Sequence, residues 1–101
     1  MLPIMDVSRW QGRINWDKVK ASDFVSGVML RALGNSAKDA PSKPYIDPTF
    51  ERNYRECQRL GIACGVYYYC KAVNTAEADA ELALLRKVLT GKTVQLPVAV
   101  Q

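Results

Sequence analysis

Short apolar runs alternate with helix-like segments along the whole chain of 101 residues. The strand-like runs cover residues 3–7, 24–33, 62–70 and 94–100, and each is followed by turn residues or the chain end. The segments between them are long enough for right-handed crossovers between parallel strands. This order predicts an α/β fold of βαβαβαβ type with a parallel sheet. It leaves open whether the sheet is half of an irregular (βα)8-like barrel or a small open sheet, and the length predicts one domain over 1–101.

Two of the predicted helices have clear start and stop signals. Asn15 is suited to cap a short helix over 16–22. Asp47 reads as the N-cap of a second helix, with Pro48 at its first position and Gly61 at its end.

The third predicted helix runs from a capping Thr75 to Leu89. Its apolar residues recur at helical spacing, so one stripe is expected to face the core. The residues expected on that stripe are Ala78, Leu82, Leu85 and Leu89. Residues 34–46, with two prolines, are expected to form a long polar loop, and loops of this length in compact domains are often functional.

Charge and hydropathy exclude two kinds of partner. The formal net charge is +4, but the basic residues are scattered, so we expect no nucleic-acid partner. No apolar stretch approaches the roughly 18–20 residues needed to span a bilayer, so membrane insertion is not expected. Met1 to Val7 has neither a basic start nor a cleavage-site pattern, and no signal peptide is visible.

The absence of histidine excludes a His-containing zinc site and a histidine-based catalytic triad. Three cysteines, Cys57, Cys64 and Cys70, make a weak case for a metal, and Cys64 and Cys70 are too far apart along one strand to bridge directly. We expect all three to be small buried apolar residues.

Asp6 is the main candidate for chemistry, because it stands at the end of the first predicted strand, where barrel enzymes place reacting groups. The alternative is that Asp6 merely caps the following turn. Arg31, at the end of the second strand, is expected beside Asp6 in a parallel sheet. There it would keep the carboxylate ionised and bind a sugar or a carboxylate, or simply form an ion pair.

Three aromatic side chains are candidates for carbohydrate binding. Tyr67 and Tyr69 alternate along the third strand and so share a face, although strand aromatics are more often core residues. Trp10 lies in the loop after Asp6 and is the better candidate for an exposed platform.

Five motifs, in order and with the expected spacings, resemble the lysozymes of glycoside hydrolase family 25. They are Asp-Val-Ser-Arg-Trp-Gln-Gly-Arg-Ile-Asn-Trp at 6–16, Leu-Arg-Ala at 30–32, Asp47 with Phe50 and Asn53, Gly-Val-Tyr-Tyr-Tyr at 65–69, and Leu-Pro-Val-Ala-Val at 96–100. The resemblance covers the whole chain, and the agreement of five motifs is more specific than any one of them.

The resemblance implies an N-acetylmuramidase that hydrolyses the β-1,4 bond between N-acetylmuramic acid and N-acetylglucosamine in peptidoglycan. It implies a flattened, irregular α/β barrel, with Asp6 as the first-strand catalytic aspartate and Arg31, Tyr67 and Tyr69 in the substrate cleft. It implies no metal and no organic cofactor. The expected location is extracellular, at the cell wall, or in a phage endolysin released from the cytoplasm.

The sequence departs from the family pattern at its last residue. The family carries an Asp-x-Glu pair at the end of the fourth strand, and Gln101 stands at the aspartate position. Glycoside hydrolysis takes two carboxyl groups, so we expect residues 1–101 to be inactive in isolation. The alternatives are a non-catalytic glycan-binding module and a structural half-barrel whose open strand edges bind a second copy or a complementary chain.

Overall fold

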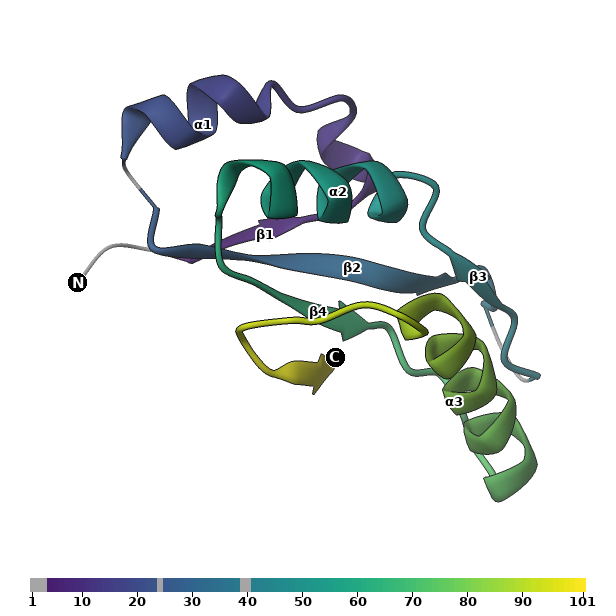
Figure 1. The fold of residues 1–101 in the computed structure, drawn as a ribbon. Helices are drawn as coiled ribbons and strands as arrows, with labels where there is room; N and C mark the ends of the chain where they lie inside the picture. Colours follow the sequence, from purple (N-terminus) through teal and green to yellow (C-terminus); the bar gives the residue numbers. More distant parts are fainter. Residues whose placement is uncertain (1–3, 24, 39–40) are drawn as a thin grey trace.

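The computed structural model describes residues 4–23, 25–38 and 41–101, and it has the alternating α/β order expected (Figure 1). Pro3 and Phe24, at the predicted starts of two strands, lie outside the described residues. The elements in chain order are β1 (Ile4–Val7), the 3-10 turn η1 (Arg9–Gln11), α1 (Trp16–Ser22), β2 (Gly27–Asn35), β3 (Pro44–Ile46), α2 (Phe50–Leu60), β4 (Cys64–Tyr68), α3 (Thr75–Leu89) and β5 (Val98–Val100).

Four strands form a parallel sheet in the order β1-β2-β4-β5, as the crossovers predict. The register places Asp6 beside Met29 and Arg31 beside Tyr67, and Tyr67 in turn beside Ala99. These residues therefore lie on one face of the sheet, because side chains alternate along a strand.

The expectation of a loop over 34–46 is wrong at both ends. β2 continues to Asn35, and β3 pairs with it antiparallel, with Gly34 opposite Tyr45, so the sheet is mixed. The Asn35 side chain stabilises this hairpin, since its amide donates to Ser42 Oγ and its carbonyl oxygen accepts from the Lys43 backbone.

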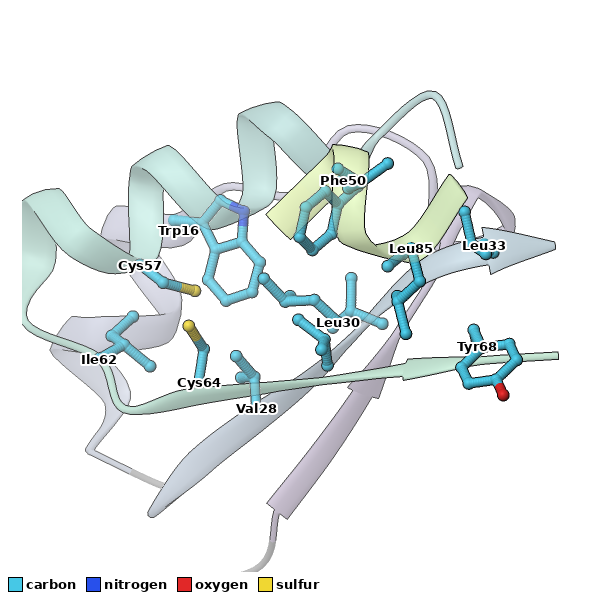
Figure 2. Packing of buried hydrophobic residues seen from close by; sticks show 14 residues of the cluster. Trp16, Val28, Leu30, Leu33, Phe50, Cys57, Ile62, Cys64, Tyr68 and Leu85 are labelled. Carbon is cyan, nitrogen blue, oxygen red and sulfur yellow. The ribbon is translucent and has the colours of Figure 1, made fainter. Parts of the chain in front are cut away.

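The other face of the sheet carries the core. α1 and α2 lie over this face, and the N-terminal strands run beneath them (Figure 1). Trp16 and Phe50 point from the helices toward Leu30 (Figure 2). The buried hydrophobic cluster comprises Val7, Trp16, Val28, Leu30, Ala32, Leu33, Phe50, Cys57, Ile62, Cys64, Val66, Tyr68, Leu85 and Val88.

The cysteines behave as expected in part. Cys57 and Cys64 are fully buried and their sulfurs face one another in the core, whereas Cys70 is only half-buried (Figure 2). All three are free thiols.

The helix boundaries follow the predicted signals, with two corrections at the caps. Asn15 caps α1, and Gly61 ends α2 in the left-handed conformation. Because α2 begins at Phe50, Thr49 and not Asp47 takes the N-cap position, and the Asp47 carboxylate accepts the Thr49 N–H just before the helix as well as the Arg31 Nε–H. Asn74, not Thr75, caps α3 by accepting the Glu77 N–H.

The predicted inward face of α3 is rotated. Leu82 is 38% exposed, whereas Glu81 is 1% exposed. The reason is that the Glu81 carboxylate accepts hydrogen bonds from Ser42 Oγ at 2.5 Å and from the Lys71 backbone N–H at 3.1 Å. These polar contacts turn the helix so that Leu85 remains buried while Leu82 moves to the surface.

The face opposite the helices is closed at one end by the chain entering β5. A Cβ on Gly65 would lie only 2.8 Å from Leu96 Cβ and from Met29 Sδ, and nearer still to the Pro97 carbonyl oxygen. Glycine at this position therefore lets Leu96 and Pro97 cross the sheet. Within the described ranges, no helix combines the length and hydropathy needed to cross a membrane.

Candidate functional site

The Asp6 side chain lines a hollow on the face of the sheet opposite the helices. The hollow has a volume of about 280 Å³ and is lined by Asp6, Met29, Tyr67, Ala99, Val100 and Gln101. The Asp6 side chain makes no hydrogen bond or ion pair with another described residue. The turn after β1 is capped by Ser8, whose hydroxyl accepts the Trp10 N–H. Asp6 is therefore not the turn cap, and its carboxylate is available to a ligand.

Arg31 does not pair with Asp6, contrary to expectation. Its Nε lies 2.9 Å from Asp47 Oδ2, and the two side chains are 10% and 0% exposed. The parallel register sets Met29 rather than Arg31 beside Asp6. The β2–β3 hairpin then brings Asp47 back to the guanidinium.

Asp47 ties together three segments of this end of the sheet. One oxygen accepts from Arg31 Nε and from the Arg9 backbone N–H, and the other accepts from the N–H and hydroxyl of Thr49. Burial raises the pKa of Asp47, but the hydrogen bonds from Thr49, Arg9 and Arg31 outweigh it and hold the pKa below its ordinary value. Asp47 is therefore a buried, fully ionised carboxylate near neutral pH.

Two arginines and two aromatic rings form the rim beside this buried pair. The Arg9 guanidinium carbon lies 4.6 Å from the Trp10 ring centre and 5.4 Å from that of Tyr45. Arg31 approaches Tyr45 from its own side, at 5.7 Å from the ring centre, and donates to the Tyr45 hydroxyl at 3.3 Å. A Cβ on Gly34 would collide with the Tyr45 ring, so glycine is what lets this ring lie across β2.

Tyr67 stands between the hollow and the buried ion pair. Burial raises the pKa of Tyr67, the Arg31 charge opposes this, and the negative charges of Asp6 and Asp47 add to the increase. A hydrogen bond with the Ser8 side chain lowers the pKa slightly in turn, and the phenol remains protonated at neutral pH, so it is a donor beside the hollow. An exposed carboxylate beside a protonated phenol is suited to bind sugar hydroxyls and to stabilise a cationic sugar.

The remaining candidates occupy different positions. Trp10 is 73% exposed, which fits a platform. Tyr69 follows the last residue of β4, is 41% exposed, and lies beneath the Lys71 ammonium rather than in the lining of the hollow. Asp6 and Tyr67 thus line the same hollow, and Trp10 and Arg31 belong to the same rim. Tyr69 belongs to neither the hollow nor the rim.

Sequence reasoning missed Arg9 and Tyr45 and misassigned Asp47. The available signal for Asp47 was its place directly before Pro48, which also fits a helix cap. Tyr45 gave a weaker signal, an aromatic residue in a polar segment. In the described part of the chain, no three His, Cys, Asp or Glu side chains gather so as to hold a metal ion.

Two solved structures with the same fold are, by their titles, an autolysin and the catalytic domain of an endolysin. The modular autolysin LytC from Streptococcus pneumoniae superposes with a TM-score of 0.80 and 32% identity, over 96% of this chain and 21% of that one. The catalytic domain of endolysin ply40 from bacteriophage P40 of Listeria monocytogenes gives a TM-score of 0.77 over 98% of this chain and 46% of that one. Its 18% identity is evidence for the fold alone.

Two curated relatives are similar to this chain in sequence. Lysozyme M1 of Streptomyces globisporus is 32% identical over 78 residues, which are 74% of this chain and 24% of the relative. Uncharacterized protein YegX of Escherichia coli strain K12 is 35% identical over 81 residues, 79% of this chain and 28% of the relative. The chain thus spans about a quarter of the length of these relatives. The sequence pattern that defines Glycosyl hydrolases family 25 matches residues 5–100, and the chain belongs to this family.

Proposed function

We propose that this chain is a peptidoglycan-directed, muramidase-like domain of the kind that in the intact family hydrolyses the β-1,4 bond between N-acetylmuramic acid and N-acetylglucosamine, and that residues 1–101 alone are inactive. The observation that carries the proposal is the Asp6 carboxylate, which lines the hollow beside Tyr67 and has no hydrogen-bond or ion-pair partner among the described residues. Family membership and the similarity to Lysozyme M1 support it. So does the similarity to the LytC structure, which has also been solved in complex with a synthetic peptidoglycan ligand.

Asp6 is the catalytic carboxylate in this proposal, placed to stabilise or attack the sugar cation. Tyr67 donates a hydrogen bond in the cleft, and Trp10 stacks on a pyranose face. Tyr69, which does not line the hollow, contacts a sugar further along the glycan. Arg31 binds the glycan through the N–H groups that it does not use on Asp47 or on the Tyr45 hydroxyl. The reaction assigned to these residues takes no metal or organic cofactor.

Residues 1–101 form a single domain in this proposal, and their sheet is half of an irregular (βα)8-like barrel. The polypeptide alone binds the wall without lysing it. In the described part of the chain, Asp6 is the carboxylate that lines the hollow, and Gln101 contributes an amide that cannot act as an acid. Loss of a general acid typically costs about 10²–10⁴-fold in rate.

Partition onto purified peptidoglycan tests the binding role. The chain is expected to sediment with the insoluble wall, and Trp10→Ala and Asp6→Asn to weaken this retention. Val73→Ala is the control, because Val73 is 69% exposed and does not line the hollow. Retention that is absent, or that both variants leave unchanged, contradicts the proposal. Clearing of a wall suspension by these 101 residues contradicts the inactivity.

Exposed sheet edges favour a second candidate function, association with another chain. β1 and β5 are the outer strands of the described parallel order, and Ile4, Val98 and Val100 are 53%, 48% and 63% exposed. Apolar edge strands pair readily with other chains. A second copy or a complementary chain would cover them, and wall binding that is absent while a stable oligomer forms would favour this candidate.

The proposed place of action is the cell wall. An exported protein would reach it from outside the membrane, whereas a phage endolysin would be released from the cytoplasm. The similarity to an autolysin and to an endolysin supports both routes equally.

A further inference from the structure

We propose that Arg9, held between the rings of Trp10 and Tyr45, is the centre of an anion subsite that binds an acidic group of the glycan. The group is a carboxylate or a phosphate attached next to a pyranose ring. The inference rests on the proposed function for its ligand, because it names which feature of the wall glycan the rim would recognise.

The backbone of Arg9 is fixed before any ligand arrives. Ser8 and Gln11 form a capping box around η1, in which the Gln11 side-chain oxygen accepts the Ser8 N–H at 2.6 Å. The Arg9 N–H donates to Asp47 Oδ2 at 3.0 Å. A buried carboxylate therefore anchors the residue from below.

The Arg9 side chain is ordered by rings rather than by an acid. Its guanidinium packs on Trp10 and Tyr45, and it makes no ion pair with a described residue. Arg31, Arg52 and Arg59, by contrast, each contact a carboxylate. Stacking covers the faces of a guanidinium and leaves its N–H edge for a planar anion, which it binds with two parallel hydrogen bonds.

The charges around Arg9 favour an anion. Arg9 and Arg31 approach the same Tyr45 ring, and the nearest acid that they share is Asp47. Asp47 is 1% exposed and its oxygens already accept four hydrogen bonds. Its single negative charge therefore neutralises one of the two arginines, and its oxygens are not accessible to solvent or to a ligand. The rim therefore keeps one positive charge in excess.

The exposed Trp10 ring beside Arg9 indicates that the anionic ligand is an acidic saccharide. Trp10 is 73% exposed, so its ring is accessible for stacking against a pyranose while its partner Arg9 reaches a substituent. N-acetylmuramic acid carries a lactyl carboxylate at such a position wherever no stem peptide is joined to it. A phosphate-bearing wall polymer shares the same chemistry, and a neutral chitin oligomer lacks it.

Titrations of the full chain with three probes test the subsite. The probes are a soluble glycan containing muramic acid, a neutral chitin oligomer of the same length and inorganic phosphate, and the readout is tryptophan fluorescence. We expect the acidic glycan to bind about tenfold tighter than the neutral one at low salt, because a charge-assisted hydrogen bond contributes this order of free energy. Arg9→Gln should abolish that preference without weakening neutral binding. Arg86→Gln, an exposed arginine on α3, should leave the preference intact.

The outcomes separate this inference from the proposed function. Equal preference in wild type and Arg9→Gln overturns the subsite while leaving glycan binding in place. Phosphate binding that Arg9→Gln removes, in a chain that binds neither glycan, supports the subsite and contradicts the proposed function. No binding of any probe overturns both. Circular dichroism confirms folding of Arg9→Gln, which is expected because the side chain is exposed.

Discussion

Arg31 Nε and Asp47 Oδ2 lie 2.9 Å apart with both side chains nearly or fully buried, and this contact joins the middle of β2 to the segment that enters α2. The same carboxylate oxygen holds the backbone of Arg9 in η1. The contact therefore supports the rim that carries Trp10, and it explains why a charged pair is kept in a small fold.

Substitution of one member of the Arg31–Asp47 pair should strongly lower the free energy of unfolding. Arg31→Met leaves Asp47 charged and buried, so we expect a loss of about 3–5 kcal/mol in the free energy of unfolding in urea. Arg59→Met is the matched control, because Arg59 is 48% exposed and pairs at the surface with Asp17 at 3.1 Å and with Glu56 at 2.7 Å. Exposed pairs contribute about 0–1 kcal/mol. Equal losses in the two variants would contradict the role of the buried pair.

Stability should fall as acid protonates Asp47. The pKa of Asp47 is lowered in the folded chain, so the unfolded chain binds the proton more readily and protonation favours unfolding. This contribution is complete well above the ordinary value of about 3.9 and is lost as the pH falls through the lower pKa of the folded chain. Urea titrations from pH 7 to pH 3 measure it. Asp47→Asn should flatten the decline below about pH 4, and an unchanged slope would refute the assignment.

Gly34→Ala should disturb the rim through Tyr45. The added Cβ collides with the Tyr45 ring, and overpacking of this kind costs about 1–3 kcal/mol. The same substitution in a Tyr45→Ala background should cost much less, because the ring is gone. A double-mutant cycle in urea measures the difference, and the pair is uncoupled if the two costs agree.

The exposed edge of β5 should drive self-association of the isolated chain. Val100 is 63% exposed at this edge, and Val100→Lys should lower the weight-average mass measured by analytical ultracentrifugation at high concentration. Val73→Lys, a substitution at a 69% exposed valine outside the sheet, should not. A wild-type chain that sediments as a monomer throughout would contradict this prediction.

Local sequence signals were sufficient for most of the fold. The bounds of α1 match Trp16–Ser22 because Asn15 accepts the Lys18 N–H, a contact three residues away. The parallel order follows from strand and crossover lengths, which are also local. The identity of the family rests on motifs that a reader can see in the printed sequence.

Contacts between distant segments account for what the sequence did not predict. The rotation of α3 depends on Glu81 reaching Ser42 and Lys71. The partner of Arg31 depends on the β2–β3 hairpin, which returns Asp47 to the sheet. Neither helical periodicity nor strand register contains that information. Asp6 was identified from its position at a strand end, and the structure places it in a hollow, while its catalytic role stays a prediction.

The most direct measurement maps a soluble muramic-acid-containing glycan onto the isotope-labelled chain by NMR. We expect the largest amide shifts on the face opposite the helices, at Asp6, Met29, Tyr67 and Ala99, with the rim at Trp10. Shifts confined to α1 and α2, or no shifts at saturating glycan, would contradict the claim that this face of the sheet is the glycan site.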